Sequence, residues 1–167
     1  MKAAIIKNFG NKLRVRVCGI LIKDGSILMV LHKSLGVEGM LWAPPGGGMN
    51  FGSSAEENLI REFREETGLI VEVEHFLFIN EFLEPPLHAI ELFFEVRQTG
   101  GVLSAGKDPE MPDGHQIIEK IAFLSKGDIM KISRKQIHNI FKPDYDHNRV
   151  LQMKGYYLMG NRIPSGI

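Results

Sequence analysis

The sequence predicts an α+β fold in which helices pack on a mixed β-sheet. One amphipathic helix is predicted over residues 54–67, and segments rich in β-branched and aromatic residues surround it. The chain has 167 residues, of which 44% are hydrophobic, and a domain of this size buries about 70% of the surface of its unfolded chain. We therefore expect a single domain over residues 1–142. Residues 143–167 are expected to form an extension that packs on this domain or lies at a dimer interface.

The charge balance and the hydropathy exclude several classes of function. Twenty Lys and Arg residues offset twenty Asp and Glu residues, so no overall basic field would draw the chain to nucleic acid or to an anionic membrane. Residues 3–6 are the only apolar run before Lys7, which is far too short for a secretory core or a membrane span. The single cysteine, Cys18, excludes an internal disulfide framework and is expected to be a small core residue. These features predict a cytoplasmic protein with a small-molecule partner.

A hairpin and a loop are predicted before the helix. Residues 12–33 alternate apolar and polar side chains on both sides of Asp24 and Gly25, a dipeptide that tolerates the positive φ of a tight turn. Residues 41–53, LWAPPGGGMNFGS, contain two prolines that lack amide protons and three successive glycines. We expect this second segment to be a loop without regular structure.

The predicted helix carries boundary signals at both ends. Ser53 or Ser54 can cap the N-terminus, and Glu56 or Glu57 follows three residues later to complete a capping box. Gly68 supplies the stop, because glycine adopts the left-handed conformation that ends many helices. The helix is therefore expected from about Ser54 to Thr67, and a cluster of acidic residues lies in its last turns.

The segments after the helix predict strands and one further helix. Residues 69–83, 88–98 and 116–124 are rich in β-branched and aromatic residues, which is typical of strands. Residues 128–141 place apolar side chains at helical spacing, and Pro143 ends that pattern. The tail that follows shows no clear periodicity.

The first helix gathers three carboxylates on one side. At about 100° per residue, Glu62, Glu65 and Glu66 form a stripe that borders the apolar stripe of Leu59 and Phe63. We therefore expect the carboxylates to be partly buried. Like charges at this spacing cost about 0.2–0.5 kcal/mol per pair, and the helix C-terminus adds about 0.3–1 kcal/mol for each anion. A cation should offset this unfavourable charge.

Two kinds of cation can do so. Arg61 and Arg64 could pair with the carboxylates on a solvated helix face, as charge runs on helices usually do. Alternatively, Mg²⁺ or Mn²⁺ could bind, because hard divalent ions prefer oxygen ligands and keep positions open for substrate phosphates. The glutamates alone do not decide between these interpretations.

The longer pattern around the glutamates resembles the Nudix box. In this sequence Gly47 is followed by five residues, Ser53, seven residues and then REFREETGL. The Nudix box has the same spacing, with Glu in place of Ser53 and R-E-U-x-E-E-x-G-U at its end, where U is a bulky aliphatic residue. The matching positions are Gly47, Arg61, Glu62, Glu65, Glu66, Gly68 and Leu69. The chain is identified as a member of the Nudix hydrolase family, and the resemblance implies that family's α/β/α sandwich around a mixed β-sheet.

The resemblance also implies an activity and a metal site. The activity is hydrolysis of the pyrophosphate bond of a nucleoside diphosphate linked to another moiety, by attack of water on phosphorus with Mg²⁺, or with Mn²⁺ as a substitute. Glu62, Glu65 and Glu66 would bind the metal, and the carbonyl of Gly47 would be a further ligand. Arg61 would orient a carboxylate through charge-assisted hydrogen bonds.

The resemblance to the Nudix box does not identify the general base, and it does not say what the change to Ser53 does. Either Glu62 or an acid from a distant loop acts as the base in such proteins, and we favour Glu110 in GKDPEMPDGH. The glutamate of the family that Ser53 replaces mainly supports Arg61 and the loop geometry. A serine here can cap the helix, so it is expected to keep the fold and to weaken the support of Arg61.

The substrate class rests on three residues. Pro85 lies sixteen residues after Leu69, a placement similar to a feature of the ADP-ribose pyrophosphatases in this family. Phe82 could stack a base, and Arg16 could reach a phosphate. An ADP-ribose-like substrate is therefore preferred. Two alternative functions stay open. The protein could be a Nudix-like module that binds a nucleotide without turning it over, or a nucleoside triphosphate pyrophosphohydrolase. A homodimer also stays open.

Overall fold

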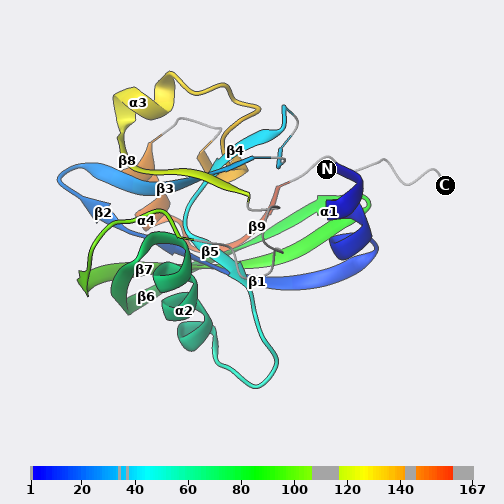
Figure 1. The fold of residues 1–167 in the computed structure, drawn as a ribbon, viewed down its shortest axis with the longest axis horizontal. Helices are drawn as coiled ribbons and strands as arrows, with labels where there is room; N and C mark the ends of the chain where they lie inside the picture. Colours follow the sequence, from blue (N-terminus) through cyan, green and yellow to red (C-terminus); the bar gives the residue numbers. More distant parts are fainter. Residues whose placement is uncertain (1, 34, 37, 107–116, 142–145, 160–167) are drawn as a thin grey trace.

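The computed structural model describes residues 2–33, 35–36, 38–106, 117–141 and 146–159, with side chains from residue 6 onward. Figure 1 shows how its elements are arranged. In chain order they are α1 (Lys2–Phe9), β1 (Lys12–Ile20), β2 (Ile22–Lys23), β3 (Ser26–Lys33), β4 (Met40–Ala43), β5 (Gly46–Gly48), α2 (Ala55–Thr67), β6 (Leu69–Glu84), β7 (Leu87–Gly101), β8 (Ile118–Ser125), α3 (Lys126–Met130), the 3-10 helix η1 (Asn139–Phe141), α4 (His147–Gln152) and β9 (Gly155–Met159).

The strands form two sheets. The first has the order β5–β1–β7–β6–β9, and the second is built around β3, which pairs with β2, β4 and β8. In the first sheet β1 is parallel to β7 and β6 is parallel to β9, whereas β5 is antiparallel to β1 and β6 is antiparallel to β7. The sheet is therefore mixed, as the sequence predicts.

Neighbouring residues on the strands of the first sheet point into two different hydrophobic cores. Val17 and Phe94 belong to the core that α2 covers, whereas Cys18 and Phe93 belong to the core that contains residues of α3, η1 and α4. This follows from the period of two in a strand, which sends successive side chains to opposite faces. Helices α2 and α3 accordingly lie on opposite sides of the strands in Figure 1. The predicted α/β/α sandwich is confirmed.

The predicted hairpin forms, but its first strand is divided between the two sheets. Asp24 and Gly25 have φ values of 49° and 70°, and the turn that they make joins β2 to β3. Strand β1 belongs to the first sheet and β2 to the second, so the chain passes from one sheet to the other at Leu21. The carbonyl of Leu21 accepts a hydrogen bond from the Leu28 N–H at 2.9 Å, which keeps the crossing attached to β3.

The segment predicted to be a loop over residues 41–53 contains most of β4 and all of β5. Residues 46–48 pair antiparallel with residues 16–18 of β1. A Cβ at Gly46 would lie 2.0 Å from the carbonyl oxygen of Val17, so the absent side chain permits a close approach between the two backbones. The prediction was wrong because glycines that suggest a loose loop can also mark close strand contact.

The prediction of one helix over residues 128–141 was also wrong. The structure has α3, an irregular connection and η1 in this region. The Trp42 N–H donates to the Gln136 carbonyl at 2.7 Å, and the His138 N–H donates to the Trp42 carbonyl at 2.8 Å. Ile137 is nevertheless buried. The apolar positions were identified correctly, but backbone pairing with β4 prevails over the helical period.

Helix α1 and strand β9 were not predicted. Strand β9 pairs in parallel with β6, where Phe78 lies opposite Gly155 and Phe82 lies opposite Met159. Val150 of α4 is buried in the core shared with α3. The described part of the tail, residues 146–159, therefore completes the first sheet and one of its cores.

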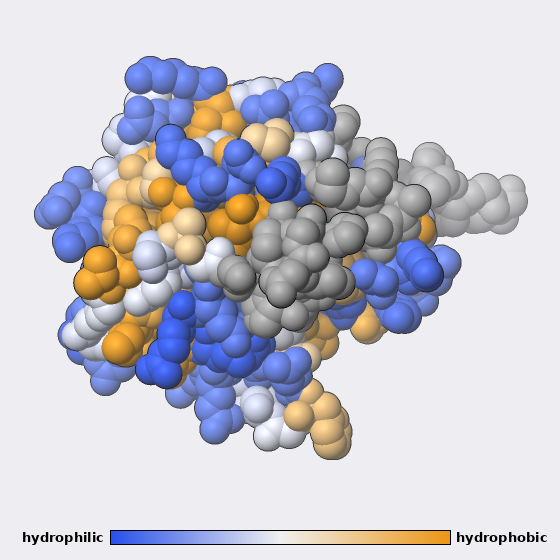
Figure 2. Space-filling model, in the orientation of Figure 1, coloured by the Kyte–Doolittle hydropathy of each residue, from blue (hydrophilic) through white to orange (hydrophobic). Residues whose placement is uncertain are grey.

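The surface carries isolated apolar side chains. Among those that are large and exposed are Leu13, Phe51, Val102, Met130 and Tyr156. On the face seen in Figure 2, hydrophobic and hydrophilic residues are interspersed. Single exposed apolar residues of this kind are normal for folded proteins. Within the described residues, we find no helix with the length and apolar character needed to cross a bilayer.

Candidate metal and active site

Helix α2 is held at both ends by contacts that its own sequence specifies. The Ser54 hydroxyl accepts a hydrogen bond from the Glu57 N–H at 3.2 Å, and the Glu57 carboxylate accepts one from the Ser54 N–H at 2.7 Å. At the other end Gly68 has φ 70° and donates its N–H to the Arg64 carbonyl. These caps fix the helix boundaries, and with them the directions in which the three glutamates point.

Two glycines allow α2 to pack close to the first sheet. A Cβ at Gly19 would lie 2.3 Å from the ring of Phe63, and a Cβ at Gly47 would lie 2.4 Å from the carboxyl carbon of Glu62. Gly47 therefore provides the space in which the Glu62 carboxylate sits. The resemblance assigns the Gly47 carbonyl to a metal, and the structure adds a steric reason for glycine at this position.

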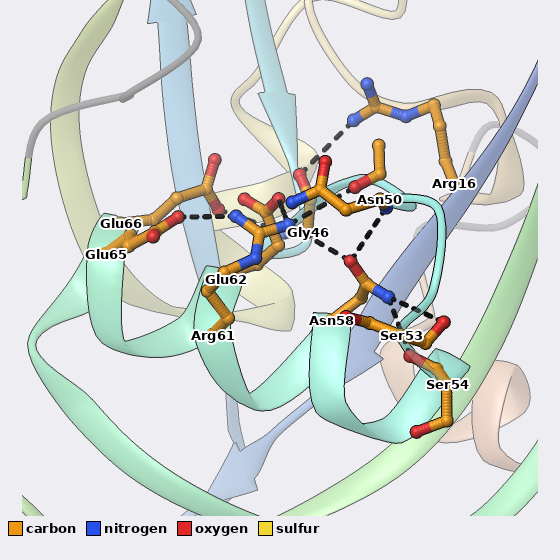
Figure 3. Close-up of polar contacts among 11 residues, drawn as sticks. Arg16, Gly46, Asn50, Ser53, Ser54, Asn58, Arg61, Glu62, Glu65 and Glu66 are labelled. Carbon is orange, nitrogen blue, oxygen red and sulfur yellow. Dashed lines mark hydrogen bonds and ion pairs between the residues drawn. The ribbon is translucent and has the colours of Figure 1, made fainter.

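Two of the three glutamates share the guanidinium of Arg61, as Figure 3 shows. Arg61 Nη2 donates to Glu62 Oε1 at 2.7 Å, and Nη1 donates to Glu65 Oε2 at 2.6 Å. The side chains are 28% exposed in Arg61, 6% in Glu62 and 30% in Glu65. Burial acts to lower the pKa of Arg61, but the charges and hydrogen bonds of Glu62 and Glu65 raise it above its ordinary value. The arginine pairing considered from the sequence is therefore present for Arg61.

The third carboxylate, Glu66, is buried against a strand. Its Oε2 accepts a hydrogen bond from the Gly46 N–H at 2.9 Å, and its Oε1 lies 3.5 Å from His32 Nε2. Both side chains of the Glu66 and His32 pair are buried. His32 Nδ1 is also buried and has no hydrogen-bond partner among the residues that the structure describes. The partial burial expected for the acidic stripe is thus strongest at Glu66.

The carboxylate oxygens on α2 are ligands that suit a hard divalent cation. In this structure, however, each of the three carboxylates is already paired with another group of the protein. Within the described part of the chain, no three His, Cys, Asp or Glu side chains are gathered closely enough to hold a metal ion. Arg61 is bonded to Glu62 and Glu65, and the Gly46 N–H is bonded to Glu66. Binding of Mg²⁺ or Mn²⁺ by these carboxylates therefore requires the guanidinium to release at least one of them.

A pocket of about 300 Å³ lies on the far side of His32 from Glu66, and the α2 carboxylates do not line it. His32 lines it and also faces Glu66, while Arg16 lines it and donates from Nη2 to the Gly46 carbonyl at 3.3 Å. Phe82 lines it as well. The structure therefore brings two of the predicted substrate residues, Arg16 and Phe82, to one cavity, which His32 connects to the predicted metal ligand Glu66.

The other two predicted residues are not found at the pocket among the described residues. Pro85 is in the turn between β6 and β7 and does not line the pocket, although its neighbour Glu84 does. Glu110, the predicted loop acid, lies outside the residues that the structure describes. The placement of the base is therefore still a prediction.

The wall of the pocket contains a buried ionic cluster that the sequence reasoning missed. Glu91 Oε2 lies 3.2 Å from His138 Nε2 and accepts a hydrogen bond from Asn80 Nδ2 at 2.7 Å, and Glu91 Oε1 lies 3.7 Å from Arg16 Nε. Burial acts to raise the pKa of Glu91, but His138, Arg16 and Asn80 together lower it to about 2. Polar residues inside two strongly apolar strands were the available signal, because buried polar groups usually have partners.

Asn58 is a second buried polar residue that the sequence reasoning missed. It lies four residues after the cap Ser54 and three before Arg61, so all three share one face of α2. The side chain of Asn58 is buried and hydrogen-bonded to the loop that precedes the helix. The spacing alone could have indicated that this amide reaches both the cap and the arginine.

Comparison with known proteins identifies the family to which this chain belongs. A family model described as "NUDIX domain" matches residues 12–144. The chain belongs to the Nudix family. An ADP-ribose pyrophosphatase from Methanocaldococcus jannaschii is 35% identical over 113 residues, which are 65% of this chain and 66% of that relative. The aligned region thus spans just under two thirds of the relative's length.

Solved structures share the Nudix fold. A NUDIX hydrolase from Nitrosomonas europaea superimposes with a TM-score of 0.68 at 17% identity, covering 86% of this chain and 93% of that one. An ADP-ribose pyrophosphatase from Streptococcus suis gives a TM-score of 0.57 at 18% identity, covering 86% of this chain and 98% of that one. Likeness at these identities shows the fold alone. The family and the fold class predicted from the sequence are both confirmed.

Proposed function

We propose that this Nudix protein is a divalent-metal-dependent hydrolase that cleaves the pyrophosphate bond of a nucleoside diphosphate linked to another moiety. The observation that carries the proposal is that His32 lines a pocket and also faces Glu66 of α2, while Arg16 lines the same pocket and donates to the Gly46 carbonyl beside α2. An ADP-ribose-like substrate is preferred, and the relative named ADP-ribose pyrophosphatase supports that preference.

The residues of α2 have separate tasks in this proposal. Glu62, Glu65 and Glu66, with the carbonyl of Gly47, would hold Mg²⁺ or Mn²⁺. The bound ion would offset the negative charge of the pyrophosphate and lower the pKa of the attacking water. Arg61 is bonded to two of these carboxylates, so it would keep one of them oriented after releasing the other.

The pocket would receive the organic part of the substrate. Leu41, Leu87 and Phe82 give it apolar walls, and a base could stack on the phenyl ring of Phe82. Arg14 lies over the ring of Phe9 at 3.8 Å from its centroid, and both of these residues line the same pocket. Apolar walls with a few charged groups are typical of sites for nucleotide-sized ligands.

Glu110 is our proposal for the general base. Glu110→Gln should lower kcat much more than it raises KM, because a base acts on the transition state rather than on substrate binding. Steady-state kinetics with the preferred substrate measure this. Unchanged kinetics would assign the base to Glu62 instead.

A release assay over a panel of substrates tests the proposed function. The panel contains ADP-ribose, other nucleoside diphosphate derivatives and nucleoside triphosphates, each with Mg²⁺, with Mn²⁺ and with excess EDTA. We expect release of a nucleoside monophosphate from ADP-ribose, and EDTA should abolish it. Turnover that survives EDTA would contradict the proposal. Turnover of triphosphates alone would favour the pyrophosphohydrolase, and binding without any turnover would favour the non-catalytic module.

A further inference from the structure

We propose that Asn58 is a positioning residue that supplies the support for Arg61 which a glutamate at position 53 supplies in other Nudix boxes. The departure at Ser53 would then be compensated within the same helix turn. The kinetic part of this inference rests on the proposed hydrolase function, whereas its structural part does not. The argument starts from what Ser53 and Asn58 contact.

Ser53 takes part in this region through its backbone. Its side chain is exposed, its N–H donates to the Asn50 carbonyl at 3.3 Å, and its carbonyl accepts from Asn58 Nδ2 at 3.3 Å. The adjacent Ser54 provides the helix cap. The hydroxyl at position 53 is therefore not needed to start α2, and the position has no carboxylate to offer Arg61.

Asn58 uses both ends of its amide to join the loop to the arginine, as the dashed lines in Figure 3 show. Its Oδ1 accepts from the Asn50 N–H at 2.9 Å and from Arg61 Nη2 at 3.3 Å. Its Nδ2 donates to the Ser54 carbonyl at 2.7 Å and to the Ser53 carbonyl at 3.3 Å. The residue is 1% exposed, so water cannot readily replace these bonds. A buried amide with four partners has one defined orientation.

The contact with Arg61 matters because of the geometry of guanidinium. Arg61 Nη2 donates to Asn58 Oδ1, to the Gly48 carbonyl at 3.3 Å and to Glu62 Oε1 at 2.7 Å. The group is planar and rigid, so fixing Nη2 also directs Nη1 toward Glu65. Asn58 therefore holds the guanidinium in the orientation in which it meets two predicted metal ligands.

Asn58 also fixes the loop on which the site depends. Residues 49–54 connect β5, which carries Gly47, to the start of α2. Because the amide bonds Asn50, Ser53 and Ser54, it sets the distance between β5 and the helix. Support of Arg61 and of the loop geometry is what the resemblance attributes to the missing glutamate, and a single side chain here provides both.

Four variants and a matched control test the proposal. Asn58→Ala removes all the amide contacts, and Asn58→Asp keeps the acceptor for Arg61 but loses the donor. Ser53→Glu restores the residue of the family, alone and combined with Asn58→Ala. The control is Thr67→Val on the same helix, because Thr67 is buried and its hydroxyl donates to the Phe63 carbonyl at 2.5 Å without touching Arg61.

Two readouts are needed. The first is kcat and KM for hydrolysis of the preferred substrate with Mg²⁺. The second is the guanidinium NMR signal of Arg61 in the protein without metal and substrate, which is resolved when rotation is hindered and averaged when the group turns freely. Thermal melts of every variant show which of them remain folded.

We expect Asn58→Ala to lower kcat by about 10- to 100-fold, with a smaller change in KM, and to release the Arg61 guanidinium into fast rotation. Asn58→Asp should keep most of the activity and a hindered guanidinium. Ser53→Glu should leave kcat equal or higher and should restore part of the activity when combined with Asn58→Ala. Thr67→Val should lower the melting temperature and leave both readouts unchanged.

Several results would overturn the inference. Asn58→Ala with a hindered Arg61 and normal kcat would show that the amide is only structural. An equal loss of kcat in Thr67→Val would show that any weakening of α2 has this effect. A failure of Ser53→Glu to rescue Asn58→Ala would show that the two positions are not equivalent. If the wild-type protein hydrolyses nothing, the proposed function fails, and the NMR series still decides the role of Asn58.

Discussion

The protein buries carboxylates in two neighbouring regions and partners them differently. On α2 one arginine, Arg61, serves both Glu62 and Glu65, and its side chain is 28% exposed. In the pocket wall Glu91 is buried and has His138, Asn80 and Arg16 around it. In the proposed function the first carboxylates would exchange the partly exposed Arg61 for a metal ion, whereas Glu91 is surrounded by groups of the fold. The difference leads us to expect a chemical role for the carboxylates of α2 and a structural role for Glu91.

The surroundings of Glu91 are consistent with a fixed charge. Cys18 lies close to it, and burial followed by the charge of Glu91 raises the pKa of the Cys18 thiol above its ordinary value. A thiol in this state is neutral and unreactive. The lowered pKa of Glu91 keeps its carboxylate ionised at neutral pH, and we expect this charge to stabilise the fold beside the pocket.

The largest effect that would sharpen this comparison is expected for Glu91→Ala. Removing one member of a buried ionic cluster leaves the other polar groups without a partner, which typically costs about 3–5 kcal/mol. Urea unfolding at pH 7 measures the loss of unfolding free energy, and Glu72→Ala is the control, because Glu72 is an exposed residue of β6 that pairs with the exposed Arg97. Similar losses in the two variants would show that Glu91 is not a structural anion.

The loss of unfolding free energy in Glu91→Ala should become smaller as the pH falls. The folded-state pKa of Glu91 is about 2, below the ordinary value of 4.5, so its contribution to stability is present above pH 4.5 and is lost as the pH falls toward 2. The gap in unfolding free energy between wild type and Glu91→Ala should therefore narrow over this range. Unfolding curves at several acidic pH values test this, and a gap that widens would contradict the ionised state.

The next effect is expected at the exchangeable carboxylates. Glu62→Gln should lower kcat by on the order of 100- to 1000-fold, because a metal ion supplies several kcal/mol of transition-state stabilisation and one ligand is lost. The melting temperature should change little, since the lost partner Arg61 is partly exposed. Release of nucleoside monophosphate is the measurement. A variant that keeps normal activity would remove Glu62 from the metal site.

The smallest effect concerns Glu65→Gln combined with Glu66→Gln. Two anions leave a helix C-terminus, which relieves about 0.5–2 kcal/mol, but Arg61 loses its ion pair with Glu65, a partly exposed pair that contributes up to about 1 kcal/mol. At position 66 the glutamine oxygen can still accept the hydrogen bond from the Gly46 N–H. The variant should therefore melt at or slightly above wild type in chelator. It should not respond to Mg²⁺, whereas wild type gains about 2.7 kcal/mol at a hundredfold excess over Kd.

Thermal melts with chelator and with millimolar Mg²⁺ decide this case. A double variant that melts well below wild type in chelator, together with a wild type that ignores Mg²⁺, would make the glutamates structural partners of Arg61. The two regions would then be alike, and the comparison between exchangeable and fixed carboxylates would fail.

The amino-acid sequence by itself determined the helix that carries the site. Its capping box, its glycine stop and the partial burial of its acidic stripe were all predictable, because caps and helical periodicity depend on residues at most a few positions apart. The spacing from Gly47 to Leu69 also determined the family, which the match over residues 12–144 confirms. Local patterns were sufficient wherever the interacting residues are close in the chain.

Only the tertiary structure decided the features that join distant segments. Strand β5 exists because glycines let residues 46–48 approach β1, and residues 136–138 are extended because their backbone pairs with Trp42. Glu91 meets His138 across nearly fifty residues of chain. Each depends on a partner that no local window contains, and a buried hydrogen bond or strand contact outweighs a propensity of a few tenths of a kcal/mol. That is why the helix was predictable and the pocket beside it was not.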